Sequence, residues 1–156
     1  EHEDAVIAGF REQSRMVCVG VKAIISRCIE ENSSVIIDGV HLISDVLELE
    51  TYAGDAFITP VCLGLPDREA FEGRFAQRAS EAPARPEHRY LDHLDEILKI
   101  QDYLIETSTA PGIPVITTST VESLTSKVSM VVSEQLQEQE EIKKALNGAR
   151  KGRKKQ

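Results

Sequence analysis

Three short apolar runs divide this 156-residue chain, and longer segments with helical periodicity fill the spaces between them. The runs cover residues 35–38, 57–65 and 113–117, and Val, Ile and other apolar residues dominate them. Strands that are apolar throughout are typical of a parallel sheet covered on both faces. Segments that alternate between helix and strand favour the same architecture. The sequence therefore predicts an α/β fold built as a three-layer parallel sheet.

Helical periodicity predicts the outer layers. Apolar residues at positions 17, 21, 24, 25 and 28 indicate one face of an amphipathic helix. Asp67 is a suitable N-cap for a later helix. The predicted helices cover residues 10–31, 45–50, 67–80 and 88–108, and a last one starts near Thr120. In parallel sheets of this kind ligands bind beyond the carboxyl ends of the strands, which places Asp38 at the predicted binding edge.

Charge is distributed unevenly along the chain. The formal net charge is −8, yet seven of the 18 basic residues lie in 143–156 without an acid, so the preceding residues carry 11 basic against 26 acidic side chains. A body this acidic repels nucleic acid, and we expect nucleic-acid contact only weakly, through the tail. The tail, residues 141–156, is predicted to be disordered.

Three cysteines form no CxxC pair and no apolar run approaches the roughly 20 residues of a membrane span. The acidic start, EHEDAVIAGF, lacks the pattern of a secretion signal. We therefore expect a cytoplasmic protein with no membrane contact. Oligomerisation stays open at this stage.

Asp38 is the sharpest chemical signal. It ends the apolar run VIID and is followed by Gly39. A phosphoryl-transfer enzyme uses a carboxylate in such a place near its magnesium ion or its attacking hydroxyl. An acid that only caps the turn after the strand fits the same pattern equally well.

Arginines gather in the next part of the chain. Residues 68–89 contain five arginines and no lysine: Arg68, Arg74, Arg78, Arg85 and Arg89. Arginine grips phosphate through two parallel hydrogen bonds. A helix–loop–helix over about residues 67–90 that carries them suits a lid closing on a transferred phosphate. Nearby acids nearly balance the charge, so ordinary surface ion pairs explain the pattern as well.

Two further observations limit the chemistry. The four histidines have no metal-ligand spacing, and His41 is expected from the residues alone to pack beside the end of the strand. No glycine is followed by lysine, so the glycine-rich loop that holds the phosphates of ATP is absent from the sequence. A kinase therefore requires a phosphate loop, and the strand that precedes it, upstream of Glu1, and we expect the parallel sheet of this chain to be incomplete.

The run GFREQSRMVCVGVKAIISRCIEENSSVIIDGVHL, residues 9–42, resembles the 2-phosphoglycerate kinase family. The similarity continues through DREAFEGRFAQR at 67–78, RYLDHLDEILKIQDYL at 89–104 and GIPVI at 112–116, and so covers nearly the whole chain except the tail. Asp38 stands where the family has Glu. The resemblance implies a P-loop kinase fold of which this chain is the C-terminal part, occupying residues 1–140.

The resemblance also implies an activity and a set of site residues. The activity is phosphorylation of 2-phosphoglycerate to 2,3-diphosphoglycerate, with ATP and Mg²⁺ as cofactors and a phosphorylated small molecule as substrate. Asp38 takes the place of the catalytic acid, as general base or as a magnesium ligand, directly or through water. Arg74 and Arg78 match the lid positions that neutralise the transferred phosphoryl group. The expected substrate-binding residues are Arg11, Gln13, His41, Arg85 and Arg89.

Two other functions remain open on the sequence. One is a non-catalytic binding module derived from a P-loop kinase that has lost its phosphate loop. The other is a P-loop kinase that acts on a different phosphorylated or polar alcohol. A phosphate loop in the upstream sequence would support an enzyme, and its absence would support the binding module.

Overall fold

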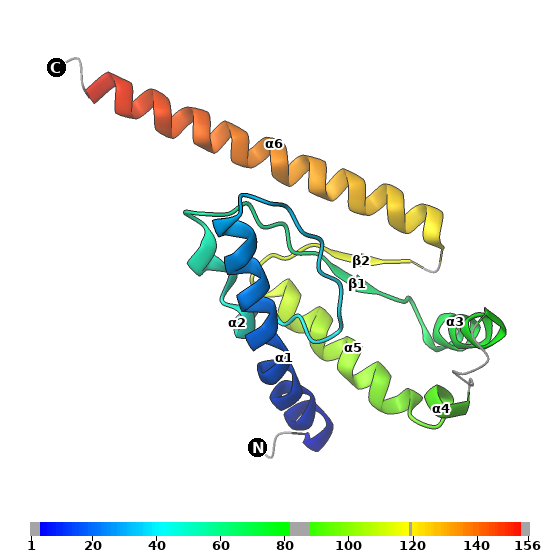
Figure 1. Ribbon diagram of the computed structural model, residues 1–156. Helices are drawn as coiled ribbons and strands as arrows, with labels where there is room; N and C mark the ends of the chain where they lie inside the picture. The colour runs from blue at the N-terminus through cyan, green and yellow to red at the C-terminus, as the bar shows by residue number, and fades with distance from the viewer. Residues whose placement is uncertain (1–3, 82–87, 119, 154–156) are drawn as a thin grey trace. The chain divides into compact units, whose positions relative to one another are not determined.

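The structure is a computed structural model that describes residues 4–81, 88–118 and 120–153; beyond Glu141 it describes the backbone and, of the side chains, only that of Lys144. Contacts divide the chain into two units, Glu1–Thr117 and Thr118–Gln156. Figure 1 labels the elements, which in chain order are α1 (Ala5–Glu30), α2 (Ser44–Leu47), the 3₁₀ helix η1 (Leu49–Tyr52), β1 (Cys62–Gly64), α3 (Arg68–Glu81), α4 (His88–Leu91), α5 (Leu94–Thr109), β2 (Val115–Thr117) and α6 (Val121–Arg153).

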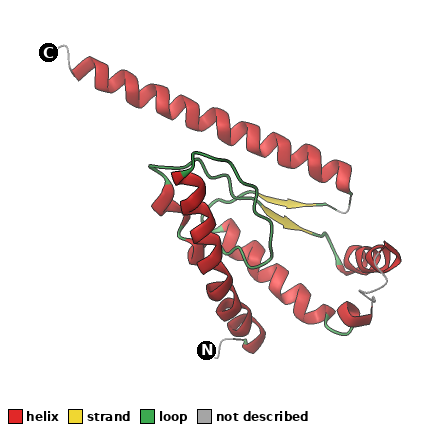
Figure 2. Cartoon of the chain, viewed as in Figure 1, coloured by secondary structure: helices red, strands yellow, loops and turns green. Residues whose placement is uncertain are grey.

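The sheet of the first unit consists of two parallel strands. Cys62 lies opposite Val115, and Gly64 lies opposite Thr117. The chain passes from β1 through α3, α4 and α5 before it returns as β2, and Figure 2 shows α5, the last of these helices, beside the two strands. A parallel pair needs such a crossover, because a tight turn can join only antiparallel strands. The α/β class predicted from the sequence is confirmed, although most of the described residues are helical.

The strand predicted at residues 35–38 does not form. Residues 33–39 are loop, and no backbone group of residues 34–38 forms a hydrogen bond with another backbone group in the described part of the chain. The side chain of Ile36 is 97% exposed. Val and Ile give this run a high strand propensity, but a strand also needs a neighbour to pair with. In the described part of the chain the sheet consists of β1 and β2, and this run pairs with neither.

The other two predicted strands form over shorter lengths than predicted. Of residues 57–65 only Cys62–Gly64 are strand, and of residues 113–117 only Val115–Thr117. Pro60 lacks a backbone N–H and cannot donate to a ladder. The ladder therefore starts after it.

Two small apolar clusters form the core of the first unit. One consists of Cys18, Val21 and Leu47, so it holds α1 against α2. The other consists of Phe71, Phe75 and Leu94, so it holds α3 against α5. Both predicted helix faces contribute, but Val17 and Ile24 of the predicted α1 face are exposed. The buried residues of α1 are instead Phe10, Ser14, Cys18 and Val21.

The helices between the strands follow the prediction in part. Helix α3 matches the predicted helix, and the Ala70 N–H donates to the Asp67 carboxylate at 2.9 Å as an N-cap. The helix predicted at 88–108 is divided into α4 and α5, with a break at residues 92–93. The loop of the predicted lid, residues 82–87, lies outside the described residues.

Helix α5 makes polar contacts with Leu65, just after β1, and with Asp4, just before α1. The side-chain amide of Gln101 accepts from the Leu65 N–H at 2.8 Å and donates to the Leu65 carbonyl oxygen at 3.1 Å. A Cβ atom at Gly64 would lie only 3.3 Å from the Gln101 Oε1 atom, so glycine allows this close approach. The Lys99 ammonium donates to Asp4 at 3.0 Å, and Asp4 also caps α1 by accepting from the Val6 N–H.

The second unit contains helix α6, whose backbone is helical as far as Arg153. The sequence predicted one unit to residue 140 and a disordered tail from residue 141, and this division stays a prediction. Residues 134–146 are rich in Glu, Gln, Lys, Leu and Ala, which have high helix propensities. Among the described residues no helix has the length and apolar character to cross a bilayer.

We predict that Gln101→Leu destabilises the protein by about 1–3 kcal/mol, because it leaves two half-buried backbone groups of Leu65 without a partner. Urea denaturation of the complete polypeptide measures the change. The matched control is Gln77→Leu on the exposed surface of α3, which should stay within about 0.5 kcal/mol of the wild type. Equal effects of the two substitutions would contradict this role of Gln101.

We also predict a pH-dependent contribution of Asp4. The hydrogen bond from Lys99, together with the one from the Val6 N–H, lowers the pKa of Asp4 below its ordinary value of 3.8. The folded state therefore binds this proton less readily than the unfolded state, and the stabilisation is complete above pH 3.8 and is lost as the pH falls through the lowered pKa. The difference in unfolding free energy between the wild type and Asp4→Asn should shrink between pH 6 and pH 2. A constant difference over this range would refute the contribution.

Candidate functional site

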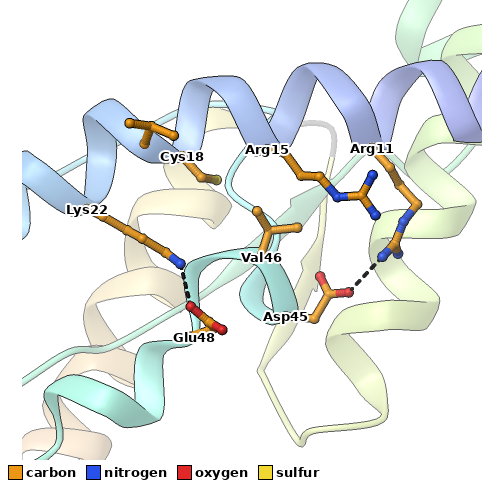
Figure 3. A pocket seen from close by; sticks show the side chains of 8 residues that line it. Arg11, Arg15, Cys18, Lys22, Asp45, Val46 and Glu48 are labelled. Atoms are coloured by element: carbon orange, nitrogen blue, oxygen red, sulfur yellow. Dashed lines mark hydrogen bonds and ion pairs between the residues drawn. The ribbon is translucent and has the colours of Figure 1, made fainter.

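A pocket of about 390 Å³ opens between α1 and α2 (Figure 3). Helix α1 lines one side with residues spaced four, three and four positions apart, so that they share a helix face. These residues are Arg11, Arg15, Cys18 and Lys22, with Val19 beside them. The opposite side is formed by Asp45, Val46 and Glu48. Three cationic side chains thus line the pocket together with two carboxylates.

Two of the cations are held by acids across the pocket. Arg11 contacts Asp45 at 3.3 Å and Lys22 contacts Glu48 at 2.5 Å, as the dashed lines in Figure 3 show. The contact raises the pKa of Lys22 and lowers the pKa of Glu48. Glu48 itself has a left-handed backbone with φ of 53°, between α2 and η1. These pairs keep both cations charged and oriented at the pocket wall.

Arg15 is bound differently from the other two cations. Its ion pair is with Glu12 at 3.0 Å, one turn away on the same helix and outside the pocket lining. Both side chains of this pair are more than half exposed. Because exposed pairs of this kind contribute little, a ligand can draw Arg15 away at small cost.

A third element fixes Arg11. Its guanidinium donates a hydrogen bond to the hydroxyl of Tyr103 on α5, and this bond is the main cause of the raised pKa of Arg11. The ring of Phe10 stands edge-on to Tyr103 at 6.2 Å and stacks on His41 at 5.3 Å. Arg11 therefore connects α1 to α2 and to α5.

The structure brings some of the predicted substrate-binding residues together. His41 Nε2 lies 3.4 Å from the Gln13 Oε1 atom, and His41 also packs on Phe10. Arg11 lies on the other side of α1 from Gln13, in the wall of the pocket. Arg15 and Lys22 were missed by the sequence reasoning, although their spacing from Arg11 is a signal that could have found them.

The predicted catalytic residues are not in contact. Asp38 is exposed and, among the described residues, forms no side-chain hydrogen bond or ion pair. Arg74 is half-buried on α3, and the Arg78 guanidinium lies 5.9 Å from the centre of the Tyr90 ring. Figure 1 shows α3 at the far end of the unit from α2.

The remaining predicted residues are Arg89 and Arg85. Arg89 is exposed on α4, and Arg85 lies outside the described residues. Within the described part of the chain, no group of three or more His, Cys, Asp or Glu side chains is placed to hold a metal ion.

Comparison with known proteins identifies the family. No family model matches the chain and no solved structure matches it. It is 33% identical over 148 residues to a 2-phosphoglycerate kinase from Methanopyrus kandleri, covering 93% of this chain and 45% of the relative. It is 36% identical over 126 residues to one from Pyrococcus horikoshii, covering 81% and 40%. The match to one from Methanocaldococcus jannaschii is 33% over 130 residues, covering 83% and 41%. The chain belongs to the 2-phosphoglycerate kinase family.

The family resemblance stated from the sequence is thereby confirmed. The chain spans less than half the length of these curated relatives. The α1 side of the pocket lies within residues 9–42, which carried the resemblance. The opposite side, residues 45–48, follows directly after that run.

Proposed function

We propose that residues 1–156 form the substrate-binding part of an ATP-dependent kinase that phosphorylates 2-phosphoglycerate to 2,3-diphosphoglycerate. The observation that carries the proposal is the 30–36% identity to 2-phosphoglycerate kinases over most of the chain. In the reaction, the free hydroxyl of the substrate attacks the terminal phosphorus of ATP, the bond to ADP breaks, and the hydroxyl proton is released.

The charge of the pocket supports this substrate. 2-Phosphoglycerate carries a carboxylate and a phosphate, and Arg11, Arg15 and Lys22 offer three cations along one helix face. Asp45 and Glu48 hold two of these cations in place before substrate binds. We assign Arg15 to the phosphate, because its exposed pair with Glu12 is the easiest of the three to exchange.

Gln13 and His41 extend the proposed substrate site beyond the pocket. Their contact with each other leaves hydrogen-bonding capacity on both side chains, since the amide of Gln13 also carries two donors. Arg89 and Arg85 are proposed to reach the substrate from the lid. In this arrangement the lid supplies its charges only when it closes.

Asp38 is the proposed catalytic acid. Its exposed carboxylate has no partner among the described residues, so it is available to accept the substrate's proton or to contact Mg²⁺ through water. Mg²⁺ usually keeps several waters and takes one or two carboxylates together with phosphate oxygens, and a single acid fits that requirement. When bound, Mg²⁺ neutralises charge on the phosphates.

Arg74 and Arg78 are proposed to stabilise the phosphoryl group in transfer. They lie on α3, which begins directly after β1. Closure of α3 and α4 as a lid is the movement that would bring them to the substrate. The stacking of Arg78 on Tyr90 at 5.9 Å gives it a resting position in the open state.

The proposed fold is that of a P-loop kinase with a three-layer parallel sheet. The residues of this chain do not fit the phosphates of ATP, since no glycine is followed by lysine. The proposal therefore assigns the phosphate cradle to a segment outside residues 1–156.

We predict that Arg15→Gln raises the KM for 2-phosphoglycerate about 10- to 100-fold in the complete polypeptide, because it removes one charge-assisted hydrogen bond to the substrate. Release of ADP in a coupled assay measures it. The matched control is Arg27→Gln, an exposed arginine on the same helix that pairs with Glu31 outside the pocket. An equal KM for the two variants would show that Arg15 does not bind the substrate.

We predict that Asp38→Asn lowers kcat about 10²- to 10⁴-fold, as expected when a general base is lost. The complete polypeptide is assayed with 2-phosphoglycerate and with other phosphorylated alcohols, and residues 1–156 alone are expected to show no turnover. Recovery of the variant's activity at high Mg²⁺ concentration would assign Asp38 to the metal instead of the proton. If the wild-type polypeptide binds 2-phosphoglycerate and never phosphorylates it, the proposed kinase activity is rejected and the non-catalytic binding module is supported.

A further inference from the structure

The pocket between α1 and α2 has charged side chains at its two ends. Lys22 and Glu48 lie at one end, and Arg15 lies toward the other (Figure 3). Cys18 and Val46 lie between them, and burial raises the pKa of the Cys18 thiol, so this middle part is uncharged. The distribution suits a small ligand that carries two separate anionic groups.

The Lys22 end of the pocket holds a carboxylate of the protein itself. The Lys22 Nζ atom donates to the Glu48 Oε2 atom at 2.5 Å, and this hydrogen bond raises the pKa of Lys22. The ammonium is therefore charged at neutral pH. It has three N–H donors, and in the described part of the chain only this contact uses one of them. Lys22 thus has both the charge and the free donors that a ligand carboxylate requires.

Glu48 can give way to another carboxylate. It lies between α2 and η1 with φ of 53°, and its carbonyl oxygen accepts from the Thr51 hydroxyl at 2.8 Å, which fixes its backbone. Its side chain is 58% exposed and that of Lys22 is 34% exposed. Exposed ion pairs contribute little to stability. A ligand carboxylate can therefore replace Glu48 on Lys22 without disturbing the fold.

The spacing of Arg15 and Lys22 fits the size of the proposed substrate. The two residues are seven positions apart on one face of α1, which separates them by about 10 Å along the helix axis. The carboxylate and the phosphate of 2-phosphoglycerate are attached to the same carbon, and each hydrogen bond adds about 2.9 Å. Because both side chains are long, their charged ends can close the remaining distance and hold one anionic group each.

We infer that Lys22 is a specificity-determining residue that binds the carboxylate of the substrate in exchange for Glu48, while Arg15 holds the phosphate. The inference rests on the proposed function, which supplies the substrate. A phosphorylated alcohol without a carboxylate leaves the pair of Lys22 and Glu48 in place and gains no contact at this end. The pocket thereby selects a phosphorylated hydroxy acid over the other phosphorylated alcohols that the sequence left open.

Calorimetric titration of the complete polypeptide with two ligands tests the inference. The ligands are 2-phosphoglycerate and glycerol 2-phosphate, which has a hydroxymethyl group in place of the carboxylate. We expect the wild type to bind 2-phosphoglycerate about 10- to 100-fold more tightly, as one charge-assisted hydrogen bond allows. Lys22→Gln should reduce this preference to less than about 3-fold, by weakening the binding of 2-phosphoglycerate alone.

Glu48→Gln is the matched variant, because it breaks the same ion pair from the other side. It should bind 2-phosphoglycerate about 2- to 5-fold more tightly than the wild type, since the competing carboxylate is gone. If both substitutions weaken the binding of 2-phosphoglycerate equally, the pair is only structural and the inference is overturned. An equal loss of affinity for both ligands in Lys22→Gln also overturns it, because Lys22 then does not recognise the carboxylate.

The outcomes separate this inference from the proposed function. A complete polypeptide that prefers 2-phosphoglycerate through Lys22 and transfers no phosphate from ATP upholds the inference and rejects the kinase activity. An active kinase in which Lys22→Gln keeps the preference of the wild type rejects the inference alone. A wild type that binds neither ligand rejects both.

Discussion

Helix α5 holds the first unit together through the polar contacts of three side chains, which lie within residues 99–103. The three contacts are Lys99 to Asp4, Gln101 to the backbone of Leu65, and Tyr103 to Arg11. The first and third fix α1, and the second fixes Leu65 directly after β1, three residues before α3 begins at Arg68. The pocket and the arginines of α3 are therefore both positioned by one helix. Any shift of α5 along its axis would move Arg11 and the start of α3 together.

Most helices could be predicted from the sequence, and the strands only in part, for a physical reason. A helix satisfies its own backbone hydrogen bonds, so periodicity and the Asp67 cap located α3 correctly. A strand depends on a distant partner, and propensity cannot say whether one is present. For this reason residues 113–117 contain a strand and residues 35–38 do not. Ile36 is exposed in a run that pairs with no other strand among the described residues.

The site residues could be predicted where the family resemblance named them, whereas their arrangement in space could not. Arg11, Gln13 and His41 came from the family resemblance, and the structure brings His41 to Gln13 but turns Arg11 to the opposite side of α1. Arg15 and Lys22 escaped notice because single-sequence reading weighs charges on a helix as solvated surface. Their spacing from Arg11 indicates a shared helix face, but that this face lines a pocket depends on α2 lying across from it.

The separation of Asp38 from Arg74 and Arg78 has a consequence for the proposed chemistry. Phosphoryl transfer needs an acid and its cationic partners around one phosphate, at near-contact distances. In the first unit the acid lies in an unpaired loop, and the arginines lie on α3, which follows the carboxyl end of β1. Lid closure can move α3, but it cannot give a loop residue a fixed position. Lid closure and the positioning of Asp38 are thus separate requirements of the proposed chemistry.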